Sequence, residues 1–124
     1  MATTLASFYS IDQHQQQEED NAVFQLSLNP NHLIYEGHFP NQPVMPGVCM
    51  LQLVTELTSQ ALGQPLQLKK ANQVKFLIPI VPQQVPQIQL KTRFIATLEQ
   101  TWKVTASIQL EERIFFKFKG LLSL

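Results

Sequence analysis

One segment of this sequence, residues 45–63, is apolar on nearly every side and contains no Lys or Arg. Pro46 suits the first turn of a helix, where its missing N–H costs nothing, and Gly63 suits the C-terminal cap. A helix that is apolar nearly all round belongs in a protein core rather than on its surface. The segment therefore predicts one buried helix, roughly 25 Å long at a rise of 1.5 Å per residue, around which the rest of the chain must pack.

The other hydrophobic residues alternate with polar ones, which indicates half-buried strands over residues 23–28, 88–98, 102–110 and 114–120. The last three of these segments are joined by short polar turns, a pattern typical of an antiparallel meander. Residues 66–78 predict a further strand, whereas residues 12–21 are polar without periodicity and predict a solvated loop or hairpin tip. A sheet wrapped around one helix is the economical packing, so we expect an α+β fold with a single domain over residues 1–124.

Composition excludes several classes of protein. Nine basic and nine acidic residues give a net charge of zero, which argues against a dedicated nucleic-acid binder. A single cysteine, Cys49, can form neither an internal disulfide nor a structural zinc site, and we expect it to pack in the helix rather than act as a nucleophile. No metal-ligand cluster or nucleotide motif is visible. The sequence shows neither a signal-peptide pattern nor about 20 consecutive apolar residues, so we expect a cytoplasmic protein without a membrane span.

The most informative stretch, residues 37–47, contains two glycines, three prolines and the titratable His38 immediately before the predicted helix. A proline after Phe39 favours an extended backbone there, so that His38 is presented in a defined direction. The N–H groups of Gly47 and Val48 at the helix start form a donor site for a developing oxyanion. A histidine and an oxyanion site in one unit indicate chemistry next to a carbonyl group.

These residues, Gly-His-Phe-Pro-x-x-Pro-x-Met-Pro-Gly-Val, resemble the β-hydroxyacyl-ACP dehydratase family, and the similarity is nearly continuous over residues 35–60. Residues 74–82 resemble that family's later strand and its proline-rich bend, whereas the two ends match only in strand pattern. The resemblance implies a hot-dog fold, in which an antiparallel sheet wraps around one long central helix. It also implies a homodimer or higher homo-oligomer with each active site at an interface.

The activity that the resemblance implies is loss of water across C2 and C3 of a 3-hydroxyacyl thioester, in fatty-acid or related lipid or polyene biosynthesis. The substrate would be carried on the phosphopantetheine of an acyl carrier protein (ACP) or of CoA, with no other cofactor. The resemblance assigns removal of the C2 proton to His38, which a neutral imidazole can perform near pH 7. It assigns polarisation of the thioester carbonyl to the amide of Gly47, and we expect Phe39 and Val48 to contact the substrate.

At two helix positions the sequence departs from the family pattern. The family carries a carboxylate five residues after the glycine and commonly a glutamine one turn later, but this chain has Gln52 and then Glu56. A glutamine amide cannot deliver a proton, and the two positions share one helix face. We therefore expect Gln52 to line the pocket and Glu56 to act on the leaving hydroxyl, directly or through a water. Glu56 could equally face a dimer partner or a hydrogen-bonding group and have no catalytic task.

Three functions stay open from the sequence. The preferred one is an active dehydratase in which Glu56 or a water replaces the usual acid. The second is a hot-dog acyl thioesterase, in which water attacks the thioester at the same oxyanion site. The third is a non-catalytic acyl-binding or partner subunit that completes a heterodimer with another hot-dog chain.

Charge is unevenly distributed along the chain, because six acids and no base precede Lys69 while all nine bases follow. ACPs are acidic, and complementary charge raises the rate of encounter. We therefore expect an ACP partner that docks on some of Lys69, Lys70, Lys75, Lys91, Arg93 and Lys103. An ordinary solvated sheet face explains the same residues equally well.

Overall fold

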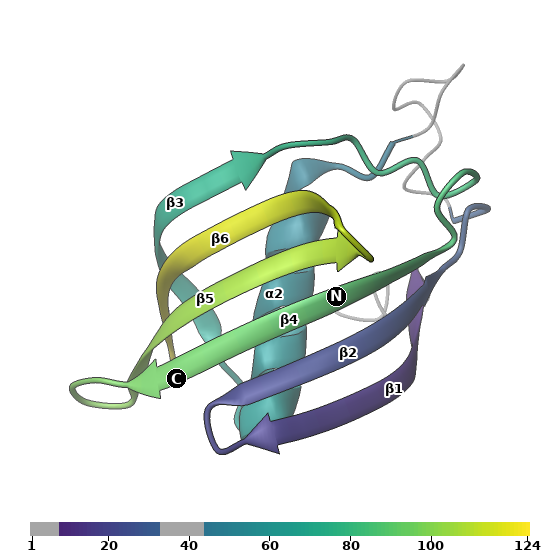
Figure 1. The fold of residues 1–124 in the computed structure, drawn as a ribbon. Helices are drawn as coiled ribbons and strands as arrows, with labels where there is room; N and C mark the ends of the chain where they lie inside the picture. Colours follow the sequence, from purple (N-terminus) through teal and green to yellow (C-terminus); the bar gives the residue numbers. More distant parts are fainter. Residues whose placement is uncertain (1–7, 33–43) are drawn as a thin grey trace.

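The computed structural model describes residues 8–32 and 44–124, and in this part of the chain six strands form one antiparallel sheet. The strands are β1 (Tyr9–Glu18), β2 (Asn21–Leu28), β3 (Gln67–Phe76), β4 (Gln87–Ala96), β5 (Thr101–Leu110) and β6 (Arg113–Ser123). Their order across the sheet is β1-β2-β4-β5-β6-β3, so that β1 and β3 are the two edges (Figure 1). The predicted meander is confirmed as β4-β5-β6.

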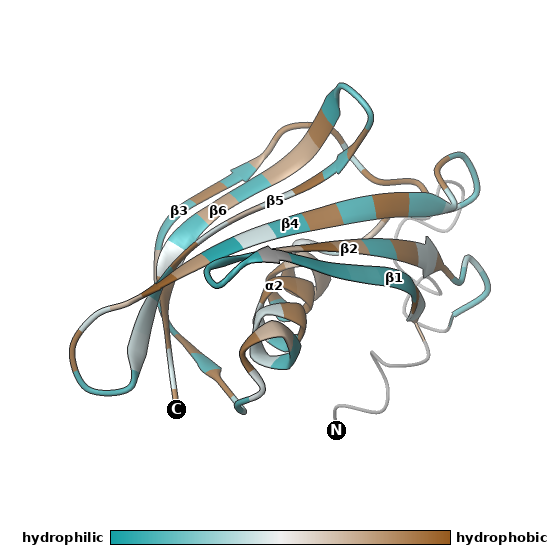
Figure 2. Ribbon diagram, turned by 60° about the horizontal axis from the view of Figure 1, so that its bottom comes forward, coloured by the Kyte–Doolittle hydropathy of each residue, from teal (hydrophilic) through white to brown (hydrophobic). Residues whose placement is uncertain are grey.

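The one helix of the described residues, α2 (Gly47–Leu62), lies against one face of the sheet (Figure 2). The predicted caps are confirmed: Pro46 precedes the helix in an extended conformation, and Gly63 ends it with a φ of 70°. The Gly63 N–H donates to the carbonyl of Gln60, which satisfies one of the last carbonyls of the helix. The core between helix and sheet consists of aliphatic and phenylalanine side chains from both layers, such as Leu53, Leu57, Phe24, Leu90 and Phe116.

Each central strand divides its residues between an inner face toward α2 and an outer face. On β4, the inner face carries Ile88, Leu90, Thr92 and Phe94, all buried, whereas Lys91 and Arg93 are exposed on the outer face. The hydroxyl groups of Thr58 on α2 and Thr92 on β4 share a hydrogen bond of 2.8 Å inside the core. The bond satisfies two buried hydroxyl groups where α2 packs on β4.

The prediction of a solvated loop or hairpin tip over residues 12–21 is correct for the tip and wrong for residues 12–18, which lie in a strand. Residues 9–18 form the edge strand β1, and only Glu19 and Asp20 make the turn into β2. Strand formation here depends on backbone pairing with β2 rather than on alternation, because an edge strand can expose polar side chains on both faces. Local contacts support the pairing, since the Ser27 hydroxyl donates to Asp12 over 2.5 Å and the His14 ring stacks on Phe24 with centroids 4.2 Å apart.

The described residues contain neither a membrane-spanning helix nor a metal-binding cluster. No helix among them combines the length and apolar character needed to cross a membrane. Nor do three or more His, Cys, Asp or Glu side chains within residues 8–32 and 44–124 come together as a metal site would require.

Candidate active site

The start of α2 has N–H groups that the described residues leave without an acceptor. Pro46 stands at the N-cap and offers no side-chain acceptor, and the first turn contains no acidic residue. The carbonyl of Pro46 accepts from Cys49 and Met50, but none of the described residues accepts from the N–H of Gly47 or Val48. Because the first N–H groups of a helix carry partial positive charge, this end of α2 can stabilise a negatively charged oxygen.

Next to these N–H groups is a cavity of about 330 Å³ whose lining side chains are all apolar, among them Met50, Phe76 and Ile78. The Phe76 ring lies directly against Gly47: a Cβ atom built on that glycine would stand 2.8 Å from Cζ of the ring. A side chain at position 47 would therefore require the Phe76 ring to move. Phe76 was not predicted as a site residue, although its position in the stretch 74–82 that resembles the dehydratase family was a usable signal.

A polar group extends from β1 to the outer side of α2. The Tyr9 hydroxyl donates to Oε1 of Glu56 over 2.9 Å, and Nε2 of Gln52 lies 3.4 Å from Oε2 of the same carboxylate. Burial, followed by the nearby negative charge of Glu56, raises the pKa of Tyr9 well above its usual range, so the hydroxyl stays protonated and remains a donor. Tyr9 was not predicted as a site residue, because its partner lies 47 positions away in the chain.

The structure brings only some of the predicted site residues together. Gln52 and Glu56 are neighbours, as their spacing predicted, but Gln52 is exposed and lines a different hollow from the cavity at Gly47. His38 and Phe39 lie outside the described residues, so their predicted roles stay predictions. Cys49 is buried, and burial raises the pKa of its thiol, which favours a packing role.

The edge strand β3 and the neighbouring start of α2 expose apolar side chains. Val48 is 70% exposed and Phe76 is 56% exposed, and Leu68, Leu77 and Ile78 are also exposed. One side of β3 pairs with β6, whereas its other side has no strand partner among the described residues. An exposed apolar edge of this kind is a candidate surface for association with another chain.

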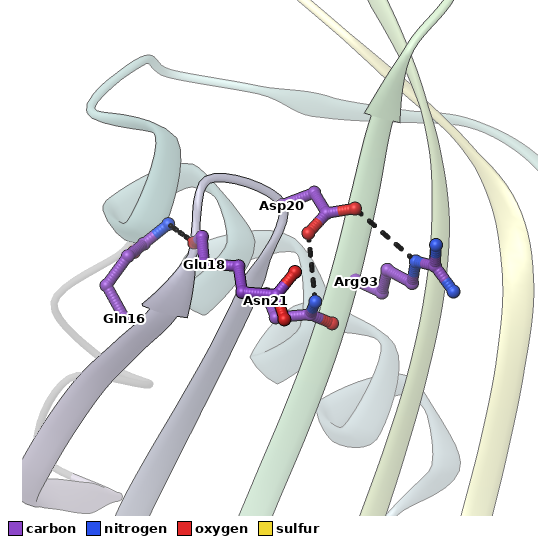
Figure 3. Close-up of polar contacts among 5 residues, drawn as sticks. All are labelled: Gln16, Glu18, Asp20, Asn21 and Arg93. Atoms are coloured by element: carbon purple, nitrogen blue, oxygen red, sulfur yellow. Dashed lines mark hydrogen bonds and ion pairs between the residues drawn. The ribbon is translucent and has the colours of Figure 1, made fainter.

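The bases predicted to bind ACP lie on the outer face of the sheet, with one exception. Lys70, Lys75, Lys91, Arg93 and Lys103 occupy outward positions, as the strand register requires. Lys69 stands at a register shift between β3 and β6, so the pairing does not fix its direction. Arg93 forms an ion pair of 3.6 Å with Asp20 in the β1–β2 turn, and Asp20 also accepts from the Asn21 amide (Figure 3).

Comparison with known proteins places this geometry in a family. A sequence profile described as ApeI dehydratase matches residues 14–109. The 3-hydroxyacyl-[acyl-carrier-protein] dehydratase FabZ of Syntrophobacter fumaroxidans is 25% identical over 115 residues, which cover 86% of this chain and 77% of the relative. FabZ of Clostridium botulinum strain Loch Maree is 26% identical over 99 residues, covering 74% of this chain and 69% of the relative.

Solved structures show the same fold. The dehydratase heterocomplex ApeI:P from Xenorhabdus doucetiae matches with a TM-score of 0.73 at 22% identity, over 93% of this chain and 97% of that one. A mutant of the Staphylococcus aureus thioesterase SAV0944 matches with a TM-score of 0.69 at 14% identity, over 98% and 97% of the two chains. The profile spans more than half of the chain, and the sheet wraps one helix as the sequence predicted, so this protein belongs to the ApeI-like dehydratase family and has the hot-dog fold.

Proposed function

We propose that this protein dehydrates 3-hydroxyacyl thioesters carried on the phosphopantetheine of an acyl carrier protein. The observation that carries the proposal is the pair of N–H groups at Gly47 and Val48, which have no acceptor among the described residues and adjoin an apolar cavity. The family supports the reaction type, and the names of the FabZ relatives support the substrate class.

In the proposed reaction, the thioester oxygen accepts a hydrogen bond from the Gly47 N–H while the C2 proton leaves. Negative charge then develops on that oxygen, where the helix N-terminus stabilises it. Removing one such donor from an enzyme typically costs about 10²- to 10³-fold in kcat. His38 is the proposed base, on the strength of its motif.

Glu56 is the proposed carboxylate that acts at C3. Because it lies roughly 13 Å along α2 from Gly47, it would act on a thioester held at the Gly47 N–H of a second chain in a dimer. The Tyr9 hydroxyl donates to one oxygen of this carboxylate over 2.9 Å and so orients the side chain. An ionised carboxylate is the form needed for hydration of an enoyl thioester, where it accepts a proton from the attacking water while protonated His38 returns one to C2. In the dehydration direction the same two protons move in reverse, so the carboxylic acid protonates the leaving hydroxyl.

Gln52 is proposed to position Glu56 rather than to transfer a proton. Its amide can donate to the carboxylate and to a hydroxyl group at C3, but it cannot supply the proton that makes hydroxide a leaving water. Compared with the family pattern, this chain still has one carboxylate on this face of α2, but the carboxylate stands one turn later, at Glu56 instead of position 52.

Hydration of a short enoyl thioester tests these roles, with wild type, His38→Ala, Gln52→Glu and Glu56→Gln compared. We expect loss of turnover in His38→Ala, and a fall of about 10²- to 10⁴-fold in Glu56→Gln, the usual worth of general acid–base catalysis. A strong gain in Gln52→Glu together with no change in Glu56→Gln would show that Glu56 is not the replacement carboxylate. Release of free thiol from a saturated acyl thioester would instead indicate a thioesterase.

We propose further that β3 associates with a second hot-dog chain, either a copy of this one or a related subunit. The exposed apolar side chains at Val48, Leu68 and Phe76 support this, and the similar ApeI:P structure is itself a heterocomplex. Sedimentation of the purified chain distinguishes the two cases. A stable two-chain species supports a homodimer, whereas a monomer that gains mass and activity with a second hot-dog protein supports a heterodimer.

A further inference from the structure

We propose that the outer face of the sheet is the docking surface for an acidic acyl carrier protein. This inference rests on the proposed function, because it concerns how the same thioester substrate is delivered. The surface, here called the basic face, consists of seven cationic side chains at outward positions on four neighbouring strands: Lys70, Lys75, Lys91, Arg93, Lys103, Lys117 and Lys119.

Strand register assembles these residues into three rows that run across the sheet. In the first row Lys91 on β4, Ser107 on β5, Lys117 on β6 and Lys75 on β3 follow one another. The second row is Arg93, Thr105, Lys119 and Gln73, and the third is Ile95, Lys103, Leu121 and Lys70. Two of the central bases, Lys117 and Lys119, were absent from the sequence prediction, because only the pairing of β6 between β5 and β3 places them there.

Little negative charge opposes these cations. None of the four strands β3, β4, β5 and β6 contains an Asp or Glu. Among the described residues, the one ion pair on this face joins Arg93 to Asp20, and the Arg93 side chain is 60% exposed, so the pair is weak. Neighbouring strands are about 4.8 Å apart, so each cation lies within a Debye length of about 10 Å of at least one other, and the potentials of such neighbours add.

The shape and chemistry of the basic face favour a transient, charged partner. Hollows of about 370 Å³ and 600 Å³ lie along it, and their linings include five of the seven cations together with hydroxyl groups such as those of Thr105 and Ser107. A permanent subunit interface would have an apolar centre, which is what β3 and the start of α2 offer instead. Exposed aromatic side chains, which would suit single-stranded nucleic acid, are absent from the described residues of this face.

The basic face reaches the candidate active site at one corner. Lys75 and Lys117 form a directly opposed pair on β3 and β6. The next residue after Lys75 is Phe76, whose ring lies on the inner face against Gly47. A carrier protein bound at Lys75 and Lys117 is therefore close to Phe76, which forms a wall of the apolar cavity. Its flexible pantetheine arm can reach the cavity from this position.

The test compares two substrates that carry the same short enoyl group, one on an acyl carrier protein and one on free pantetheine. The variant is Lys117→Glu/Lys119→Glu, and the matched control is Arg113→Glu, a base at the start of β6 that lies outside the three rows and over the Phe115 ring. We expect the double variant to lower kcat/KM for the carrier-bound substrate by about 10-fold or more at low salt, within the range of electrostatic steering. Turnover of the pantetheine substrate should stay within about twofold for both variants, as expected for exposed surface changes away from the active site.

The outcomes separate this inference from the proposed function. Absence of turnover of the pantetheine substrate by wild type refutes the proposed function. Equal losses on both substrates, or none on either, refute the docking surface, and so does a change in sedimenting mass in the double variant, which would make the face a contact between chains. Retention of a DNA oligonucleotide by wild type but not by the double variant, with unchanged carrier kinetics, would assign the face to nucleic acid and refute it too.

A second measurement needs no variant and remains decisive if the double variant does not fold. Raising the salt concentration from about 20 mM to about 500 mM shortens the Debye length severalfold. For wild type, we expect kcat/KM to fall steeply with salt for the carrier-bound substrate and to stay flat for the pantetheine substrate. Parallel salt dependences would refute the docking surface.

Discussion

Replacing Gly47 by alanine tests the contact at the start of α2. The new methyl group would stand 2.8 Å and 2.9 Å from two ring carbons of Phe76, about 0.6 Å short of an ordinary contact of 3.4 Å. The ring must therefore retreat, and its 56% exposure leaves it room to swing toward solvent. We expect Gly47→Ala to fold normally and to lose activity because the cavity wall beside the Gly47 N–H has moved.

The expected magnitudes differ sharply between stability and activity. Swinging the ring outward weakens its contact with Phe116, whose centroid lies 5.3 Å away, and such aromatic pairs contribute about 0.5–1.5 kcal/mol. Replacing a glycine by alanine in a helix stabilises the folded state by up to about 1 kcal/mol. The free energy of unfolding should therefore change by less than about 1 kcal/mol. Activity should fall by about 10- to 100-fold, since a misplacement approaching 1 Å can cost about 10²-fold.

Urea denaturation and hydration of a short enoyl thioester measure the two quantities in wild type, Gly47→Ala, Phe76→Ala and the double variant. If the collision with the ring is the cause, Gly47→Ala should lower kcat/KM by less than about threefold once Phe76 is already alanine. An undiminished loss in that background would refute the reasoning, and so would wild-type activity in Gly47→Ala. A loss of stability above about 3 kcal/mol in Gly47→Ala would show that the ring cannot move.

Three further predictions concern the framework that holds the site. Thr58→Val and Thr92→Val should each lower the free energy of unfolding by about 1–3 kcal/mol, because each leaves one buried hydroxyl without its partner. The double variant should recover most of this loss. Additive losses in urea denaturation would contradict the prediction. Gly120→Ala should prevent normal pairing of β3 with β6, because its Cβ would overlap the backbone carbonyl oxygen of Lys70; an unchanged thermal midpoint would contradict this. Tyr9→Phe should remove a pH dependence of stability: above pH 10 the unfolded state loses the Tyr9 proton while the folded state keeps it, so the advantage of wild type over the variant should shrink as pH rises. An advantage that stays constant from pH 8 to pH 11 would refute the raised pKa.

The helix and the meander could be predicted from the sequence because their signals are local. Pro46, Gly63 and an unbroken apolar run define α2, and alternation defines β4, β5 and β6. β1 could not be predicted, because its polar side chains follow no period and its backbone pairing with β2 leaves no trace in composition. The error at residues 12–18 is thus the expected error for an edge strand.

Parts of the candidate site that lie within one sequence motif could be predicted, whereas contacts between distant segments of the chain could not. The Gly47 amide and the Gln52–Glu56 pair follow from spacing within a helix. Tyr9 at the start of the edge strand β1 reaches Glu56 on α2 across 47 positions of sequence, and Phe76 at the end of β3 meets Gly47 at the start of α2. Such contacts depend on the three-dimensional path of the chain, which no local pattern records.

The two edges of the sheet differ, and the difference limits how far assembly can extend. β1 presents mostly polar side chains and two register shifts, which discourage pairing with another strand, whereas five exposed apolar residues lie on or beside β3: Val48, Leu68, Phe76, Leu77 and Ile78. A molecule with one edge strand suited to association can form a two-fold symmetric dimer through that edge, but it cannot add a third chain to the same sheet. If β3 associates with a second chain as proposed, the polar hairpin of β1 and β2 would stop the sheet from extending into an open-ended filament.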